Sequence, residues 1–314
     1  MYTNETNLPL SLSMFMVHSD YDHINEPNYI SATSLLNSIK SIVLSSRVES
    51  SSSDVSGLQA SAVGTASHDR LEKAFTNGNH IINMQKLGYP QKLIDKVVIN
   101  PDKVEEGQFP IYLEKRSIKP LNGFRIGGKF DLVMEGAVRD LKTTKVFTWM
   151  KQDFDNYVLQ GSIYRWLNPD IITENHMHID FIFTDWKAHE VQSKEGYPPQ
   201  SALEKRFNLM SMAETEQWIA SKVSNIEKYM QAEEVDIPRC TDKELWKAPN
   251  RYAYYKKPDA KRATKVFDTS AEASLRLSQD GNVGRVETRH SEAKKCNYCN
   301  ANTVCKQLKE MLLK

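Results

Sequence analysis

Hydrophobic and polar positions follow two different periods along the chain, and together they predict a succession of helices and strands. Residues 30–47 and 148–168 carry apolar side chains three or four positions apart, the spacing of one helix face. Residues 176–186 alternate apolar and polar side chains, and residues 109–115 also resemble a strand. Residues 202–231 predict a long amphipathic helix, interrupted once at most. This mixture of elements indicates an α/β protein.

A helix and a hairpin between these elements carry most of the polar groups with candidate chemistry. Residues 64–75 are predicted to form the helix. Residues 123–146 are predicted to form two antiparallel strands with a turn at 135–136, because glycine suits the second position of a two-residue turn. Counting back from that turn places Asp131 directly opposite Asp140, with Cβ atoms about 4.5–5.5 Å apart.

Composition and charge narrow the class of protein. The 314 residues are 40% hydrophobic and 26% charged, an ordinary globular balance that suits one large domain or two modest ones. The net charge of +1 argues against a basic coat protein, so any contact with nucleic acid must be local or assisted by a metal. The sequence contains no long apolar run, no N-terminal signal pattern and no GxxxxGK[ST] loop. We therefore expect a cytoplasmic protein with no membrane partner and no ATP motor.

The facing aspartates are the first candidate site. Like charges directly opposite on neighbouring strands repel each other, and a divalent cation between them removes the repulsion. Carboxylate oxygens suit Mg²⁺ or Mn²⁺. Lys142 projects to the same side as Asp140, where its ammonium can orient a water or neutralise charge on a phosphate. The alternative is a hairpin with two solvated aspartates, and in both cases we expect Asp140 to be a surface carboxylate.

Two predicted helices carry polar pairs that fit the same site. His68 and Glu72 lie four residues apart on one helix face, and an imidazole ligand from His68 would favour Mn²⁺ over Mg²⁺. Gln160 and Tyr164 share a face of the second helix and can hold a phosphate or a base. Taken singly, a surface or capping histidine and a buried amphipathic face are the alternatives.

All four cysteines lie in the last quarter of the chain. Cys296, Cys299 and Cys305 form a C-x2-C-x5-C run, and Cys240 precedes them. A CxxC loop directs two thiolates to one centre, which suits structural zinc or an iron–sulfur cluster. The alternative is four reduced thiols without a metal.

Residues 251–267 interleave basic and aromatic side chains. This pattern predicts contact with single-stranded DNA, because lysine and arginine neutralise phosphates while aromatic rings stack on unpaired bases. The alternative is a pair of exposed strands with solvated lysines. The residues expected to contact DNA are Lys256, Lys257, Lys261 and Arg262.

Four short motifs, in this order, resemble those of the RecB-like branch of the PD-(D/E)XK nucleases. They read GTASHDRLE at 64–72, GKFD at 128–131, DLKT at 140–143 and QGSIY at 160–164. Each motif is weak alone, whereas four in register are specific. The chain is also similar to stand-alone exonuclease-type members found in bacteriophage genomes, although residues 76–112 match nothing in the family pattern.

The resemblance implies a restriction-endonuclease-like core, in which helices flank a mixed central sheet with a metal site at one edge. It implies hydrolysis of DNA phosphodiesters with Mg²⁺ or Mn²⁺, in the host cytoplasm if the protein is phage-encoded. Glu114 matches a further acid of the family. The remaining roles that the resemblance implies are His68, Asp131 and Asp140 with the Leu141 carbonyl as metal ligands, Lys142 as the catalytic lysine, and Gln160 and Tyr164 as substrate contacts.

The resemblance also bears on the cysteines and on the domains. Relatives of this type often close the nuclease domain with a [4Fe–4S] cluster on four cysteines, which favours iron–sulfur over zinc. This chain departs from the better-known pattern because Cys240 follows the nuclease motifs. The expected organisation is an N-terminal segment over 1–60, a nuclease core over 61–235, and an extension over 236–314 with the cluster and the DNA-contact residues.

Three functions compete on this basis. The leading prediction is a metal-dependent DNA exonuclease that acts on single strands or DNA ends in replication, recombination or degradation. The second is a catalytically silent DNA-binding or scaffold member of a replication or recombination complex, against which the intact Asp131, Asp140 and Lys142 argue. The third is a structure-selective endonuclease or an RNA-directed enzyme.

Overall fold

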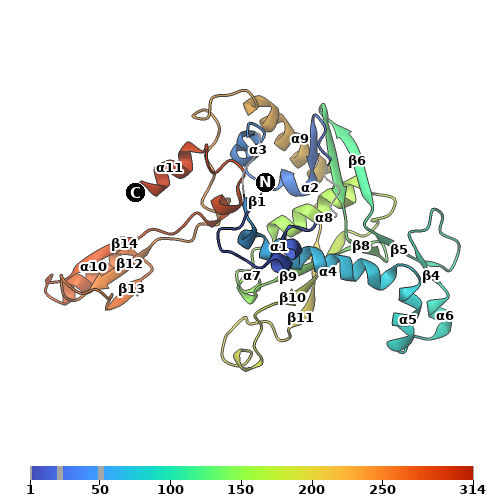
Figure 1. The fold of residues 1–314 in the computed structure, drawn as a ribbon, viewed down its shortest axis with the longest axis horizontal. Coiled ribbons are helices and arrows are strands. Elements are labelled where there is room, and N and C mark those ends of the chain that lie inside the picture. Colours follow the sequence, from blue (N-terminus) through green and yellow to red (C-terminus); the bar gives the residue numbers. More distant parts are fainter. Residues whose placement is uncertain (1, 20–23, 49–52, 314) are drawn as a thin grey trace. The chain divides into compact units, whose positions relative to one another are not determined.

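The computed structural model describes residues 2–19, 24–48 and 53–313 (Figure 1). Contacts divide the chain into two compact units, each built from two separate stretches. The first unit comprises Met1–Leu36 and Ser52–Glu227, and the second comprises Asn37–Ser51 and Lys228–Lys314. Among the described residues, no helix is both long enough and apolar enough to cross a membrane.

A mixed six-stranded sheet forms the centre of the first unit, which confirms the expected α/β class. The strand order is β11-β10-β9-β8-β5-β4. β9 runs parallel to β10 and β4 parallel to β5, while the other neighbours are antiparallel. The strands are β4 (Val97–Ile99), β5 (Phe109–Leu113), β8 (Leu132–Met134), β9 (Ala137–Thr144), β10 (His176–Phe183) and β11 (Ala202–Asn208).

A second sheet of three strands has the order β2-β7-β6, with β2 (Tyr29–Ser31), β6 (Arg116–Leu121) and β7 (Phe124–Lys129). It shares one continuous ribbon with the larger sheet. Leu113 pairs with Leu132 in the six-stranded sheet, and Arg116 pairs with Lys129 in the three-stranded sheet, in the same antiparallel register. The ribbon therefore passes from one sheet to the other between these pairs. A short parallel pair, β1 (Tyr2–Thr3) and β3 (Ser53–Asp54), lies apart from both sheets.

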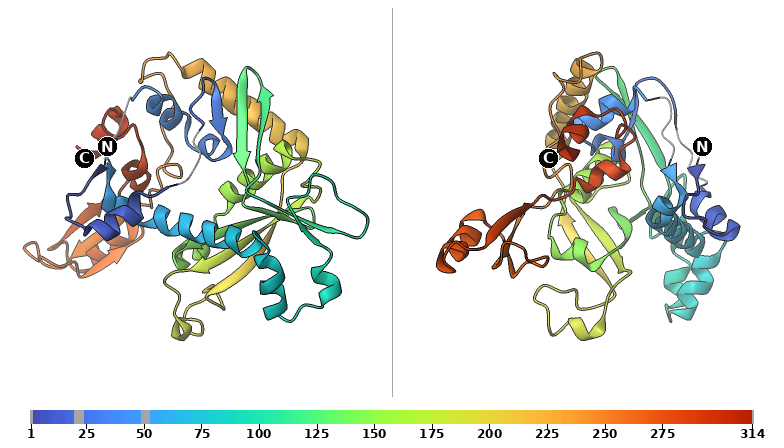
Figure 2. Two further views of the ribbon diagram at one scale, coloured as in Figure 1. Left: turned by 45° about the vertical axis from the view of Figure 1, so that its right-hand side comes forward. Right: turned by 60° about the vertical axis from the view of Figure 1, so that its left-hand side comes forward.

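Two helices contact the strands that carry the candidate site residues. α4 (Gln59–Phe75) contacts β9, and α8 (Asp155–Leu167) contacts β7 and β9. The left view of Figure 2 shows α4 as one long helix beside these strands, with α5 and α6 beyond its end. The other helical elements of the first unit are α1 (Leu10–Val17), α2 (Ala32–Leu35), η1 (Val55–Leu58), α5 (Asn79–Lys86), α6 (Gln91–Ile94), α7 (Val146–Met150), η2 (Ala188–Glu190) and most of α9 (Met212–Tyr229).

Several predicted elements are confirmed. Residues 109–115 contain β5, and residues 176–186 contain β10. The apolar face of β10 is buried, as its alternation predicts; its members are Met177, Ile179, Phe181 and Phe183. In the hairpin, both turn residues adopt a left-handed φ, +53° at Glu135 and +75° at Gly136, as a two-residue turn of this kind requires.

Three predicted helices are wrong in extent. Residues 202–208 form strand β11 because they pair along β10, so the helix begins only at Met212. Residues 148–168 divide into α7 and α8, and Gln152 between them has a left-handed φ of +51°. Residues 30–47 divide into β2, α2 and α3 (Ile39–Ser45), because the Ser38 hydroxyl caps a new helix by accepting from the Ser41 N–H at 3.1 Å.

The second unit contains a three-stranded antiparallel sheet in the order β13-β12-β14, with β12 (Arg251–Tyr255), β13 (Lys265–Phe267) and β14 (Arg285–Arg289). α10 (Ser270–Gln279) packs on this sheet (Figure 2). A separate apolar cluster joins α3 to the C-terminal region through Val43, Leu44, Ile237 and Ala301. The unit also contains η3 (Lys294–Tyr298) and α11 (Lys306–Leu312).

Candidate active site

The bend of the ribbon between the two sheets places two carboxylates side by side. The register places Glu114 opposite Asp131, and the Glu114 N–H donates to the Asp131 carbonyl at 3.1 Å. Glu114 has a left-handed φ of +51°, which is uncommon for a residue other than glycine and concentrates at functional sites. The two carboxylates therefore owe their proximity to the backbone.

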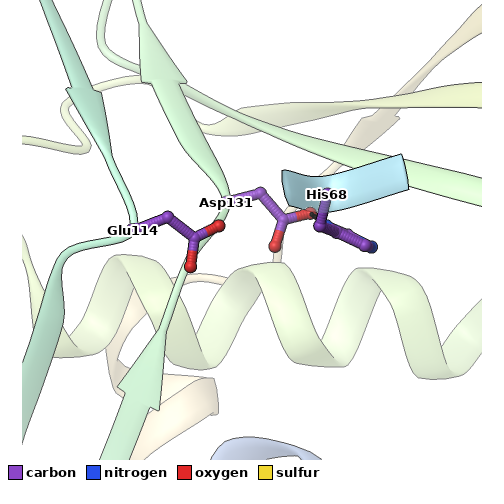
Figure 3. Close-up of side chains that lie close together, drawn as sticks. All are labelled: His68, Glu114 and Asp131. Atoms are coloured by element: carbon purple, nitrogen blue, oxygen red, sulfur yellow. Dashed lines mark ion pairs between the residues drawn. The ribbon is translucent and has the colours of Figure 1, made fainter. Parts of the chain in front are cut away.

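A histidine from α4 completes this group. The His68 Nδ1 lies 3.0 Å from the Asp131 Oδ2. One ligand atom from each of His68, Glu114 and Asp131 lies within 4.8 Å of the other two, and all three residues are half-buried. Figure 3 shows the Asp131 carboxylate between the other two side chains. One nitrogen and two carboxylates from three separate elements form a suitable donor set for Mn²⁺ or Mg²⁺.

The charges around the group also favour a cation. Burial raises the pKa of Glu114, and Asp131 and Glu72 raise it further, against the lowering influence of its ion pair with Lys129. The hydrogen bond to Asp131 raises the pKa of His68. A divalent ion bound between these half-buried carboxylates would stabilise their charged forms further.

The predicted hairpin register is confirmed at the three pairs nearest the turn, Met134 with Ala137, Val133 with Val138 and Leu132 with Arg139, but the predicted pairing of Asp131 with Asp140 is not formed. The β8–β9 ladder ends with Leu132 opposite Arg139, one pair short of the two aspartates. The Asp131 Oδ2 instead accepts from the Leu141 N–H at 3.2 Å and faces His68. Asp140 is absent from the three-residue group, although its charge and that of Asp131 still act on each other.

Asp140 forms a buried ion pair with Lys142, whose Nζ lies 2.5 Å from the Asp140 Oδ2. Asp140 is 2% exposed, so the expectation of a surface carboxylate is also wrong. Burial raises the pKa of Asp140, and Asp131 adds to this effect. Burial alone would lower the pKa of Lys142, but the carboxylates of Asp140 and Asp131 outweigh it and keep the ammonium charged.

Gln160 and Tyr164 lie on the buried face of α8. The Gln160 Nε2 donates to the Tyr164 Oη at 2.8 Å. The Tyr164 ring packs so closely on β7 that a Cβ at Gly128 would lie 2.9 Å from its Cε1 and 2.8 Å from the Leu167 Cδ1. Glycine at position 128 therefore lets α8 approach the strand that leads into Asp131.

The sequence contains a signal for one further feature of the site and none for another. The contact of Lys142 with the Tyr157 ring, 5.7 Å from Nζ to the ring centroid, follows no motif identified above. The position of Glu114 opposite Asp131 has a sequence signal. Asn122-Gly123 is a strong two-residue turn signal, both residues have a left-handed φ, and counting outward from this turn pairs Glu114 with Asp131.

The cysteines lie in the second unit near α3. The Cys240 Sγ is 3.1 Å from the Ser38 Oγ, and the Cys299 Sγ is 3.4 Å from the Ser41 Oγ. Burial, followed by the charges of the other three thiols, raises the pKa of Cys296 to about 11. Within the part of the chain that the structure describes, no three cysteine Sγ atoms lie within 4.8 Å of one another, so the compact thiol cluster that a single zinc ion needs is not present.

The predicted DNA-contact residues Lys256, Lys257, Lys261 and Arg262 are all exposed in the segment that joins β12 to β13. Two neighbouring aromatic residues are not available for stacking. Tyr254 is fully buried and donates to the Asp280 carboxylate at 2.6 Å, and Tyr255 is 5% exposed beneath the Arg285 guanidinium. The predicted combination of phosphate contact and base stacking is therefore wrong for these two tyrosines.

No protein-family model matches the chain, and neither does any curated protein. The solved structures that are similar to it include the following two. The crystal structure of SSO0001 aligns with a TM-score of 0.39 and 15% identity over 64% of this chain and 78% of that one. A Eubacterium rectale protein provisionally named an exonuclease aligns with a TM-score of 0.28 and 18% identity over 41% of this chain and 48% of its own length. Both TM-scores are below 0.5, so the site itself must carry the functional argument.

Proposed function

We propose that this protein is a metal-dependent DNA nuclease with a restriction-endonuclease-like core of the RecB-like PD-(D/E)XK type. The observation that carries the proposal is the group formed by His68, Glu114 and Asp131, whose ligand atoms lie within 4.8 Å of one another. The charged Lys142 lies close enough to this group to act on it: Asp131 raises the pKa of His68, and Lys142 lowers it. A cation-binding group beside a fixed ammonium suits attack on a phosphodiester.

Each residue has a distinct part in this proposal. His68, Glu114 and Asp131 would hold a divalent ion, with the imidazole favouring Mn²⁺. When bound, the ion supplies an activated water and stabilises charge on the phosphate. Lys142 is held protonated by Asp140, so it neutralises developing charge and does not act as a base. Asp140 positions this ammonium, and Gln160 with Tyr164 supports the strand that leads into Asp131.

The first test is digestion of end-labelled linear and closed circular DNA, each single- and double-stranded, with Mg²⁺, Mn²⁺ or EDTA. We expect linear DNA to be degraded from its ends only with a divalent ion, and the circles to stay intact. Cleavage of circles would instead indicate an endonuclease. Binding of DNA without any cleavage would indicate a silent binding or scaffold protein and would contradict the proposal.

We also propose that Cys240, Cys296, Cys299 and Cys305 bind an iron–sulfur cluster. Their mutual effect on the pKa of Cys296 supports a common centre, and the C-x2-C-x5-C run with Cys240 supplies the four thiolates that such a cluster needs. The cluster would tie α3 to the C-terminal region, where Cys299 and Cys305 pack against the Val43 cluster.

Protein purified without oxygen is expected to be brown, with visible absorbance that Cys296→Ser abolishes, because a cluster cannot retain its usual ligation on three thiolates. Ser278→Ala, which changes an exposed serine of α10 in the same unit, is the control and should keep the colour. A colourless wild-type protein that contains one zinc ion per chain would contradict the cluster.

A further inference from the structure

An unusual turn in the second unit holds a tryptophan where glycine is the normal residue. The Lys247 N–H donates to the Asp242 carbonyl at 2.9 Å, and the Trp246 N–H donates to the Lys243 carbonyl at 3.1 Å. These two bonds define a Schellman motif, whose left-handed position is usually glycine or asparagine. Trp246 occupies it with φ +52°. A bulky residue in this conformation is strained.

The strain does not serve the core of the unit. Leu245, the preceding residue, is the one that anchors the turn, because it is 4% exposed. The Trp246 side chain is 47% exposed. Glycine would form the same turn at lower cost, so the fold alone gives no reason for tryptophan. A local rule broken in favour of a large ring that stays half exposed points to a functional role.

Trp246 forms an exposed aromatic pair with Tyr298 beside the cysteine loop. The two ring centroids are 6.0 Å apart at an angle of 52°, and Tyr298 is 64% exposed. The Lys295 Nζ lies 4.6 Å from the centre of the Trp246 ring. The Lys295 N–H donates to the Leu245 carbonyl at 3.1 Å, so the backbone holds the lysine against the turn.

Two exposed rings, one of them with an ammonium held over its face, match the chemistry of single-stranded nucleic acid. An unpaired base offers a flat face to an aromatic ring, and its phosphate offers a negative charge to an ammonium. Bases within a duplex are already stacked on one another, so neither side of a base is free to stack on a protein ring. An apolar protein partner would not need the lysine, and an anionic ligand without a ring would not need the tryptophan.

We propose that Trp246, Tyr298 and Lys295 form a platform on which an unpaired base of single-stranded DNA stacks while Lys295 contacts the adjacent phosphate. The proposal deepens the proposed function by naming the strand form that the protein holds. It rests on that function only for the choice of DNA as ligand, since binding can be measured without cleavage.

The test is binding of fluorescent oligothymidylate to the full-length protein in EDTA, alongside a blunt duplex. Trp246→Gly should weaken oligothymidylate binding by about tenfold, as expected for the loss of one stacking ring, while its melting temperature stays equal or rises. Tyr298→Ala should weaken binding similarly, and Trp246→Phe should retain most of it. Tyr89→Ala, at a 48% exposed tyrosine of the first unit, is the control and should bind as wild type.

Wild-type affinity in Trp246→Gly and Tyr298→Ala would overturn the proposal, as would an equal loss on the duplex. If Trp246→Gly melts far below the wild type, Tyr298→Ala alone decides, because Tyr298 is not in the strained position. Wild-type protein that binds oligothymidylate through these rings but never cleaves DNA would refute the nuclease and leave the platform intact. Cleavage with no effect of either variant on binding would do the reverse.

Discussion

Asp131→Asn is expected to lower the rate of DNA cleavage by about 10³-fold, the size of effect that follows when a cation worth several kcal/mol of transition-state stabilisation is lost. Asparagine keeps the shape of the side chain and an oxygen that can accept from the Leu141 N–H. It removes the negative charge of Asp131, the carboxylate that lies between His68 and Glu114 in the proposed metal site. The measurement is the initial rate of cleavage with Mn²⁺, together with the rise in melting temperature that Mn²⁺ causes.

Folding should survive this substitution, because it also relieves repulsion between Asp131 and Glu114. The matched control is Asp102→Asn, which removes an exposed carboxylate from the segment between β4 and β5. It should retain both the rate and the Mn²⁺-induced thermal shift. Wild-type cleavage by Asp131→Asn would show that the three-residue group is not the catalytic metal site.

Lys142→Met is expected to abolish cleavage and also to lower the free energy of unfolding by about 3–5 kcal/mol. The stability loss follows because Asp140, almost fully buried, would lose the ammonium that lies 2.5 Å from its carboxylate. Unfolding by urea at neutral pH measures this change. The double variant Asp140→Asn/Lys142→Met removes both charges and should recover most of the stability, but it should remain inactive.

These two variants separate a structural role of the pair from a catalytic one. If Lys142→Met unfolds at the same urea concentration as the wild type, the ion pair between Asp140 and Lys142 is solvated and does not contribute to the free energy of unfolding. If the double variant cleaves DNA, Lys142 is not required for the chemistry. Stability restored without activity is the result that supports Lys142 as the charged group in the site.

Secondary structure could be predicted from the sequence where the pattern and the packing agree. β10 is such a case, since its alternating residues are buried on one face. The prediction for β11 was wrong because its residues, ALEKRFN, are mostly strong helix formers. Seven residue pairs with β10 override that local preference. A single sequence does not show that β10 has an unpaired edge at which these residues can form a strand.

The sequence offered His68, Glu114 and Asp131 as candidates, but it did not show the geometry that brings these three side chains together. Counting from the 135–136 turn pairs Asp131 with Asp140, whereas counting from Asn122-Gly123 pairs it with Glu114. Both registers occur in the structure, on opposite sides of the same ribbon. The ladder with β9 stops one pair before the two aspartates, whereas the backbone of Glu114 bonds directly to that of Asp131. The approach of His68 depends on the packing of α4 against β9, a long-range contact that residue spacing alone does not encode.

The second unit is assembled from two stretches that lie far apart in the sequence, and this has a consequence for synthesis. Ser38 at the start of α3 meets Cys240, which lies 202 residues later. At ordinary translation rates, α3 leaves the ribosome about 10–40 s before its packing partners exist. Its apolar side chains Val43 and Leu44 remain uncovered during that interval. A nascent chain that stalls before the C-terminal region is synthesised would therefore expose the apolar face of α3, a surface that chaperones bind.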